Sequence, residues 1–395
     1  MSTPYNTRFM NSLRRMLLCL SACLLLLSGV GCTRSESHQA PDLFYLYKTI
    51  EVGKNPTSVV TGDLNGDHVA DLITTNIGSD SLSVLLGIGD GNFRDPVTIR
   101  MPEQPRAVVL HDFNEDGKLD LAVATAGNNR VTILLGDGTG QFTRGDSYPA
   151  VRSPVSLVVG DFNRDRKADL AVALRNDKLL ILLGRGDGSF LQKAVYEYGD
   201  TPTAVVAADV NEDSLTDLVV THGGKMSSSV VVFLGNGDGT FRPPVAYKTG
   251  HSPLNVSVLD LNGDRHLDLL VVNGERDDIS VFFGKGDGTF TQGISFGANA
   301  GPIATVTQDF DGDGKTDIAV ANNLSSDLSV LLGKGDGTFW QPPRSYRTGA
   351  APFAITAVLF APQDPRPGLV TANNLANTVS IFLAKDPRSN LVPRN

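Results

Sequence analysis

The feature that most constrains this chain is an internal repeat. A segment that opens with proline and continues with an apolar run, an aspartate-rich stretch and a second apolar run occurs seven times. The copies open at Pro56, Pro105, Pro154, Pro202, Pro253, Pro302 and Pro352, at intervals of 48 to 51 residues. Self-similarity at a period of roughly 20 to 50 residues marks architectures built from one repeated unit. A length of 395 residues would alone suggest two or three domains, but the repeat predicts one.

Each copy is composed of short apolar runs rich in β-branched residues, which turn residues separate. The fourth copy is typical, with runs at 205–208, 218–221 and 230–234. Runs of this kind predict strands and argue against helices. A glycine-rich hairpin at 235–241 follows, and we expect its final phenylalanine to insert into the sheet. A fourth strand at 244–249 completes the copy.

Four antiparallel strands in every copy form a β-propeller blade. We therefore predict an all-β fold, a seven-bladed β-propeller of four-stranded antiparallel blades over residues 43–385, with a polar tail at 386–395. The alternative is a β-solenoid, but solenoid repeats are usually shorter, roughly 20 to 30 residues. The seventh copy ends after its third strand at 379–383, and residues 43–53 resemble an isolated fourth strand. The N-terminal strand is expected to complete the last blade and cover its edge.

The first 31 residues read as a signal peptide. Three arginines precede an apolar run of 12 residues at 16–27, which is too short to cross a bilayer as a stable helix. Small residues then lead to Cys32, an arrangement that resembles the lipobox of bacterial lipoproteins. The resemblance implies lipidation of Cys32, a tether at 32–42 and an exported protein anchored to the cell envelope, at the outer membrane or the cell surface. The alternatives are ordinary signal-peptidase cleavage, which yields a secreted protein, and a retained anchor.

Cysteine usage and charge narrow the range of partners. All three cysteines lie at or before position 32, so an intrachain disulfide cannot form in the mature chain, and packing or metal ions must stabilise it. Removal of residues 1–31 takes away three arginines and no acidic residue, which changes the formal net charge from −9 to −12. This charge disfavours nucleic acid as a partner. The oligomeric state stays open, with a monomer as the simplest expectation.

Six copies carry the pattern Asp-x-Asn/Asp-x-Asp-x-x-x-Asp between their first and second strands. Side chains at positions 1, 3 and 5 of a tightly curved loop can point inward together, and position 9 returns at the start of the next strand. Such hard oxygen ligands suit Ca²⁺, as in the first half of an EF-hand loop. The predicted calcium ligands are Asp63, Asn65, Asp67, Asp71, Asp112, Asn114, Asp116, Asp120, Asp161, Asn163, Asp165, Asp169, Asp209, Asn211, Asp213, Asp217, Asp260, Asn262, Asp264, Asp268, Asp309, Asp311, Asp313 and Asp317.

Turn chemistry is the other interpretation of these loops, since Asp, Asn and Gly all favour turns. Six loops with the same four offsets favour calcium, because a turn does not require aspartate at fixed positions. Position 6 is glycine only at Gly117 and Gly314, so the sites are expected to be unequal. We expect the all-aspartate loop from Asp309 to bind calcium most tightly and the loop with Arg166 to be among the weakest. The seventh copy has lost the pattern, and its blade is expected to lack metal.

These repeats resemble the FG-GAP/VCBS repeats of the integrin α-subunit propeller and of many bacterial surface proteins. The resemblance rests on the repeated strand pattern and on the hairpin Gly-x-Gly-Asp-Gly-Thr-Phe with its close variants, and it covers nearly all of the mature chain. It implies a seven-bladed propeller. It leaves the function open, because the same scaffold carries adhesion, lectin and enzyme activities.

A ligand is expected at the end of the blades opposite the aspartate loops. The connections after the second strands gather there, and they are polar and variable. Amide side chains suit hydroxyl-rich ligands such as glycans. The candidate ligand-binding residues are Asn76, Asn128, Asn129, Asn176, His222, Asn273, Asn322, Asn323, Asn373 and Asn374. The plainer interpretation is that asparagine caps strand ends and enters turns at little cost.

The sequence favours a calcium-stabilised binding or adhesion module that recognises a protein or a glycan through this face. One alternative is an enzyme on the same fold, a calcium-dependent lyase or hydrolase that acts on polysaccharide or phosphoester. That alternative needs a base and charge stabilisers in one pocket, and neither a Gly-x-Ser-x-Gly elbow, a His-Glu-x-x-His motif nor a phosphate loop occurs in the sequence. A lipid-anchored assembly scaffold without a small ligand is the third hypothesis.

Overall fold

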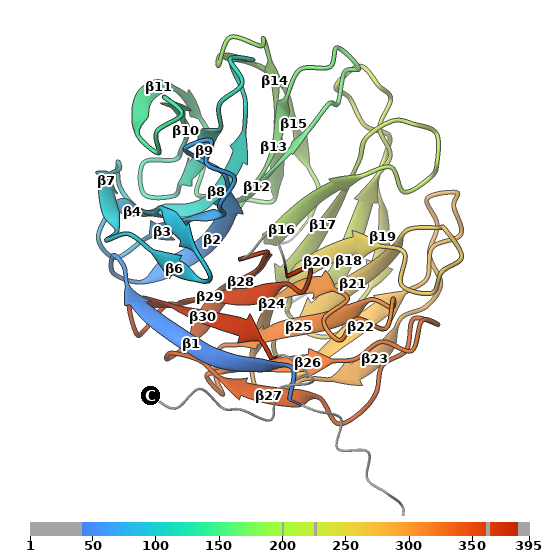
Figure 1. Ribbon diagram of the computed structural model, residues 1–395. Coiled ribbons are helices and arrows are strands. Elements are labelled where there is room, and N and C mark those ends of the chain that lie inside the picture. The colour runs from blue at the N-terminus through green and yellow to red at the C-terminus, as the bar shows by residue number, and fades with distance from the viewer. Residues whose placement is uncertain (1–41, 200, 225–226, 361–363, 386–395) are drawn as a thin grey trace, which may run out of the picture. The chain divides into compact units, whose positions relative to one another are not determined.

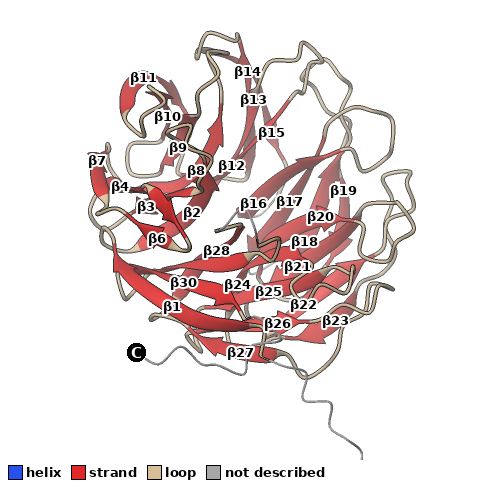
Figure 2. Ribbon diagram, in the orientation of Figure 1, coloured by secondary structure: helices blue, strands red, loops and turns tan. Residues whose placement is uncertain are grey.

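Seven four-stranded antiparallel sheets surround a common centre in the computed structural model (Figure 1). The structure describes residues 42–199, 201–224, 227–360 and 364–385. These residues form strands and connecting loops and contain no helix (Figure 2). The predicted seven-bladed, all-β architecture is confirmed. The signal peptide at 1–31, Cys32, nearly all of the 32–42 tether and the tail at 386–395 lie outside the described residues.

Each blade contains four strands in chain order, except the last, whose fourth strand comes from the start of the described chain. The first strands are β2 (Pro56–Gly62), β8 (Pro105–His111), β12 (Pro154–Gly160), β16 (Pro202–Ala208), β20 (Pro253–Leu259), β24 (Pro302–Gln308) and β28 (Pro352–Val358). The second strands are β3 (Asp71–Asn76), β9 (Asp120–Thr125), β13 (Asp169–Leu174), β17 (Asp217–Gly224), β21 (Asp268–Asn273), β25 (Asp317–Asn322) and β29 (Gly368–Asn373).

The third strands are β4 (Ser81–Leu85), β10 (Arg130–Gly136), β14 (Lys178–Gly184), β18 (Ser227–Phe233), β22 (Asp278–Phe282), β26 (Asp327–Leu331) and β30 (Thr378–Ala384). The fourth strands are β7 (Val97–Arg100), β11 (Phe142–Pro149), β15 (Phe190–Glu197), β19 (Val245–Lys248), β23 (Ile294–Gly297), β27 (Arg344–Arg347) and β1 (Phe44–Glu51). A small hairpin of β5 (Gly87–Gly89) and β6 (Asn92–Phe93) follows β4.

The second strand of each blade is buried along most of its length, which explains its continuous apolar sequence. All six residues of β9, DLAVAT, are buried, and so are all six of β13, DLAVAL. A strand with both faces covered needs apolar side chains on both faces, in place of the alternation of a half-exposed strand. Each second strand is therefore covered on one face by the preceding blade and on the other face by the following blade.

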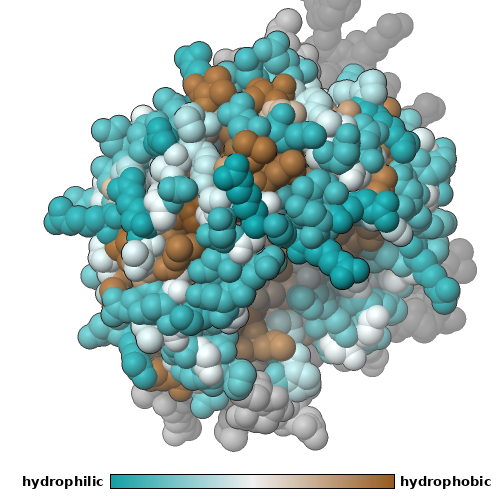
Figure 3. Space-filling model, turned by 90° about the horizontal axis from the view of Figure 1, so that it is seen from above, coloured by the Kyte–Doolittle hydropathy of each residue, from teal (hydrophilic) through white to brown (hydrophobic). Residues whose placement is uncertain are grey.

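The apolar core is divided into seven clusters, and each cluster lies between two adjacent blades. Ile133 of the second blade, for example, packs in one cluster with Leu157 and Leu170 of the third. On the side of the molecule shown in Figure 3, exposed apolar side chains form separate groups among hydrophilic ones. Stability therefore comes from contacts between the blades, and an isolated blade would expose both of its apolar faces.

The phenylalanine at the end of the glycine-rich hairpin is buried, but it inserts between two blades, whereas the sequence predicted insertion into its own sheet. Phe190 is 5% exposed and packs edge-to-face on Phe113 of the preceding blade, with ring centroids 5.5 Å apart. Phe241 packs in the same way on Phe162, at 5.7 Å. Such aromatic pairs stabilise a structure beyond the area that they bury.

The predicted closure of the ring is also confirmed. Strand β1 pairs antiparallel with β30, from Phe44 opposite Ala384 to Glu51 opposite Thr378. The last blade therefore has the strand order β1, β30, β29, β28. Its innermost strand, β28, contacts β2 of the first blade. The N-terminal strand covers the edge that β30 would otherwise expose.

We expect Phe44→Ala to lower the free energy of unfolding by about 3–5 kcal/mol, because it removes a buried aromatic ring from the closing strand. Phe44 is 2% exposed and contacts the rings of Phe310 and Tyr346 at 5.5 and 5.7 Å. Urea unfolding measures the change. Leu46→Ala on the same strand is the control, since Leu46 is 47% exposed. Equal losses for the two variants would contradict the role assigned to Phe44.

Candidate metal sites and the loop face

The six aspartate loops all connect the first strand of a blade to its second strand, so they lie at one end of the ring. The connections from second to third strands and those between blades lie at the other end, which we call the loop face. The structure therefore separates the predicted metal ligands from the predicted ligand-binding asparagines, as the sequence suggested.

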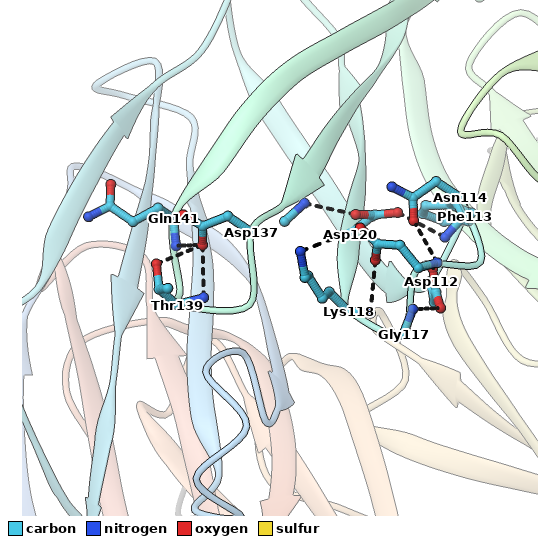
Figure 4. A network of polar contacts seen from close by, with 11 residues as sticks. Asp112, Phe113, Asn114, Gly117, Lys118, Asp120, Asp137, Thr139 and Gln141 are labelled. Carbon is cyan, nitrogen blue, oxygen red and sulfur yellow. Dashed lines mark hydrogen bonds and ion pairs between the residues drawn. The ribbon is translucent and has the colours of Figure 1, made fainter.

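Position 1 of each loop is the acceptor around which the loop curves. In the second blade, Asp112 accepts hydrogen bonds from the backbone N–H groups of Asp116 at 3.1 Å and Gly117 at 2.7 Å (Figure 4). Asn114 Oδ1 also accepts from Asp116 N–H, at 3.1 Å. The side chains at positions 1 and 3 thus point into the curve of the loop. In all six loops the N–H of position 6 donates to the position 1 carboxylate, at 2.7 to 3.0 Å.

Position 9 is a buried carboxylate that ties the loop to the hairpin beyond the third strand. Asp120 is fully buried, and its two oxygens accept from Phe113 N–H at 2.9 Å and from Gly136 N–H at 2.8 Å. The other five residues at this position make the same pair of bonds, at 2.8 to 3.0 Å to position 2 and 2.7 to 2.9 Å to the glycine that opens the hairpin.

Burial raises the pKa of all six position 9 carboxyl groups, and to about 6 for Asp169, Asp217 and Asp317. The two backbone donors act in the opposite direction and partly offset this effect of burial. Each oxygen has a second lone pair after accepting one N–H, and can still coordinate a cation. A cation at the loop would favour the ionised form of these groups.

The loop of the sixth blade brings three carboxylates together. Oxygens of Asp309, Asp311 and Asp317, at positions 1, 3 and 9, lie within 4.8 Å of one another. Among the described residues this is the one such group of acidic, histidine or cysteine side chains. The fourth predicted ligand, Asp313, faces Lys315 Nζ at 2.9 Å instead. Three hard oxygen donors at this spacing fit the chemistry of Ca²⁺.

The other five loops have asparagine at position 3, so an amide oxygen takes the place of the second carboxylate. In four of them the amide nitrogen donates to the position 5 carboxylate, as Asn65 does to Asp67 at 3.0 Å. These loops present the same number of oxygen-bearing side chains with one negative charge fewer. The loop of the sixth blade is therefore distinct in charge and in the convergence of its oxygens.

Position 6 adopts a left-handed backbone conformation in all six loops, as expected from its two glycines. Gly117 and Gly314 have φ of 81° and 82°, but His68, Arg166 and Arg265 have φ of 63°, 66° and 73°. A non-glycine residue in this region costs roughly 1–3 kcal/mol. The loops without glycine thus carry backbone strain, which is a physical reason for unequal sites.

The seventh blade cannot hold a carboxylate at position 9. Gly368 lies opposite Val358, as Asp317 lies opposite Gln308 in the sixth blade. A Cβ on Gly368 would lie 2.5 Å from the Phe360 ring and 2.5 Å from the Phe382 carbonyl oxygen. In the seventh blade, the Phe360 ring therefore packs where the other blades have a carboxylate that accepts two hydrogen bonds from backbone N–H groups.

Four of the predicted ligand-binding asparagines are buried within their own blades. Asn76, Asn273, Asn322 and Asn373 are 0% exposed. Each ends a second strand, and its amide nitrogen donates to the serine seven residues later on the third strand, at 2.8 to 2.9 Å. Their side chains are not accessible to a ligand on the loop face, because strand pairing directs them into the blade. The recurring Asn and Ser at this spacing is the sequence signal for this structural role.

Two further candidates connect adjacent blades. Asn323 Nδ2 donates to the Pro352 carbonyl at 3.2 Å, and Asn374 Nδ2 donates to the Pro56 carbonyl at 3.1 Å. Both side chains are half-buried. These amide nitrogens therefore link each of the two blades to the blade that follows it around the ring.

The remaining candidates lie on the second, third and fourth blades. Asn128 Oδ1 accepts from Thr125 Oγ1 at 2.6 Å, and Asn129 Oδ1 accepts from Ser153 N–H at 2.5 Å. Asn176 is half-buried. His222 is 3% exposed, and its ring lies 4.9 Å from that of Tyr198. Of the ten candidates, only Asn129 is exposed.

The sequence reasoning missed two apolar residues on the loop face. Leu324 and Leu375 occupy the same place in the sixth and seventh blades, and they are 74% and 69% exposed. Each follows an Asn-Asn pair at the end of a second strand. A leucine within an otherwise polar connection was the available signal.

We expect Val320→Thr to stabilise the protein by about 1 kcal/mol. Asn322 Oδ1 is buried without a hydrogen-bond partner among the described residues. In the first and seventh blades, Thr74 and Thr371 donate to the equivalent oxygens, at 3.0 and 2.9 Å. Val320 occupies that place in the sixth blade, and threonine has nearly the same shape. Urea unfolding should show the gain, and Thr371→Val a loss; a loss in both variants would contradict this account.

We expect Asp120→Asn to destabilise the protein by about 1–3 kcal/mol even in EDTA, because the amide can accept only one of the two buried N–H groups. Asp116→Asn is the control, since Asp116 has a 36% exposed side chain and its Oδ1 can keep the bond from Lys118 N–H. Thermal unfolding in EDTA measures both. If the two variants lose the same stability, position 9 has no special role in the fold.

No helix among the described residues is long and apolar enough to cross a membrane. No curated protein matches the chain.

Among solved structures, the protein BBS1N in complex with ARL6DN superposes with a TM-score of 0.62 at 12% identity, over 87% of this chain and 98% of that one. A second crystal structure of that complex, soaked with lead, gives 0.62 at 13% identity, over 89% and 99%. A protein from Lactobacillus plantarum gives 0.57 at 14% identity, over 77% and 88%. At this identity the likeness shows the fold alone.

The model of the FG-GAP-like repeat family matches six overlapping segments, at residues 63–123, 112–172, 161–220, 209–271, 260–320 and 309–361. Each segment starts at position 1 of one aspartate loop. The matches together span more than half of the chain. With this coverage, and with a blade for every copy of the repeat, the chain belongs to the family of FG-GAP-like repeat proteins.

Proposed function

We propose that this protein is a calcium-stabilised recognition module that binds a protein or a glycan outside the cytoplasm. The observation that carries the proposal is the division of the ring into two ends. One end holds six loops with repeated oxygen donors, and the other presents connections that differ from blade to blade. A rigid scaffold with variable loops on one face is the usual arrangement of a binding protein.

Calcium would be held by positions 1, 3, 5 and 9 of the six loops. The convergence of Asp309, Asp311 and Asp317 supports this assignment. Charge supports it too, because six Ca²⁺ ions would add +12 to a mature chain of −12 and relieve repulsion within the ring. Sites of extracellular modules commonly bind calcium at roughly 10⁻⁴ to 10⁻³ M, which suits an exported protein.

Export and anchoring rest on the sequence. A signal peptide at 1–31 and lipidation of Cys32 would place the ring at the cell envelope, on a tether of about ten residues. Metabolic labelling with a fatty acid, compared between the natural chain and Cys32→Ala, tests the anchor. Equal labelling of the two chains would exclude it.

The nature of the ligand is supported in part by the fold. A propeller of the same fold, BBS1N, occurs in complex with a protein partner, ARL6DN. A protein ligand is therefore one expectation, and a glycan is the other. On the loop face, exposed Leu324 and Leu375 provide apolar contact area on neighbouring blades.

We expect EDTA to lower the melting temperature and added calcium to restore it, because an ion that binds only the folded state stabilises it by about 2.7 kcal/mol at 100 times its Kd. Asp311→Asn should weaken the tightest site, since it gives the sixth loop the asparagine found in the other five. Thermal unfolding measures the first effect, and calorimetric titration with calcium measures the second. A melting curve that is indifferent to EDTA, or a titration unchanged in Asp311→Asn, would contradict the assignment.

The recognition proposal is tested by screening the full mature chain on a glycan array, with and without calcium, and by capture of envelope proteins. We expect Leu324→Ser combined with Leu375→Ser to reduce binding of any ligand found. Leu359→Ser is the matched control, because Leu359 is 59% exposed at the opposite end of the seventh blade. If only Leu359→Ser weakened binding, the ligand would bind at the end of the aspartate loops, and the proposal that the loop face binds it would be wrong.

A further inference from the structure

Two crevices open between the outer parts of adjacent blades. One has a volume of about 830 Å³ and lies between β1 of the seventh blade and the first blade. The other has a volume of about 570 Å³ and lies between β19 of the fourth blade and the fifth blade. Strands β19 and β23, which flank the second crevice, are on the right-hand side of Figure 1. We call these the β1 crevice and the β19 crevice.

The two crevices are the same feature of the repeat. Gly53 lines the β1 crevice and Gly250 lines the β19 crevice, and both begin the connection to the next blade. Glu51 and Lys248 lie two residues before these glycines, at the ends of β1 and β19. The backbone framework is thus shared, and a glutamate in one crevice corresponds to a lysine in the other.

A second pair of positions differs in the same direction. Ser79 in the β1 crevice and Arg276 in the β19 crevice both lie three residues after the buried asparagine of their blades. The Arg276 side chain is 57% exposed, and its Nε lies 3.7 Å from Asp278 Oδ2, which is 14% exposed. Asp278 can therefore orient the guanidinium while leaving its outer donors accessible.

The lining of the β19 crevice is cationic. Lys248 and Arg276 line it, and no carboxylate does. Lys248 makes no ion pair among the described residues. By contrast, the lining of the β1 crevice contains two carboxylates, Glu51 and Asp80, and a single cation, Arg100. An accessible lysine without an ion-pair partner, beside an arginine whose outer donors are free of its weak contact with Asp278, indicates an anionic ligand.

Neutral hydrogen-bonding groups complete the β19 crevice. Thr249, Thr291, Gln292 and Ser295 line it together with the two cations. Hydroxyl and amide groups both donate and accept, so they complement the hydroxyl groups of a sugar. A crevice of this size, with two cations and several neutral polar groups in its lining, matches a carboxylated sugar ring and its neighbours.

We propose that the β19 crevice binds an acidic saccharide, with the carboxylate of a uronate residue on Lys248 and Arg276 and its hydroxyl groups on Thr249, Gln292 and Ser295. This inference rests on the proposed function, since it names the ligand class for a recognition module. An acidic peptide is the less favoured ligand, because a peptide that adds to a sheet edge takes its affinity from main-chain bonds. Strands β19 and β23 offer only four residues each.

The test is calorimetric titration of the full mature chain with trimers of galacturonate, glucuronate and mannuronate, at a fixed calcium concentration. We expect at least one trimer to bind, with an affinity that falls as salt increases. A neutral trisaccharide of galactose should not bind. Lys248→Glu, which places the β1 crevice residue in the β19 crevice, should weaken binding at least tenfold, and Arg276→Ser should weaken it as well.

Arg100→Glu is the matched control, because Arg100 ends β7 in the first blade as Lys248 ends β19 in the fourth, and the change in charge is the same. Binding should be unchanged in this variant. The inference is overturned if no trimer binds, if Lys248→Glu binds as well as the natural chain, or if a glutamate-rich peptide binds in place of the trimers. A neutral glycan or a protein that binds while all three trimers fail would overturn this inference and leave the recognition proposal standing.

Discussion

The burial of each sheet against both of its neighbours is the constraint on which the rest of the structure depends. The middle strands have apolar side chains on both faces, and each inter-blade cluster takes its members from two blades. An open row of blades would leave two apolar faces in water, so closure of the ring is a condition of stability. The loops and crevices take their positions from this closed frame.

The fold could be predicted because its signals are local and repeated. Strand length, the glycine-rich hairpin and the proline that opens each first strand can all be read within about 50 residues. Because these signals recur in seven copies, a departure in one copy does not change the prediction. The missing fourth strand of the seventh copy was the one long-range inference, and a simple count of strands supported it. The aspartate pattern of the loops was visible for the same reason, since four offsets recur in six copies.

The roles of individual side chains could not be read in the same way. Asn76 and Asn129 look alike in sequence, yet one is buried against Ser83 and the other is exposed in a turn. The difference lies in strand pairing, which determines where a side chain points. Position 9 of the loops was predicted as one ligand among four, but the structure makes it a carboxylate that ties loop and hairpin together. The crevices depend on contacts between adjacent blades, and no single copy of the repeat contains them.

The pairing of β1 with β30 has a consequence for the order of events during biogenesis. Residues that lie side by side in this pair, such as Phe44 and Ala384, are separated by nearly the whole length of the ring. Because such distant contacts form late and slowly, the first strand has no partner until the last one has been synthesised. The chain therefore remains an incomplete ring with two unpaired edges until its last strand is available. A propeller of this design is prone to aggregation until its final residues arrive.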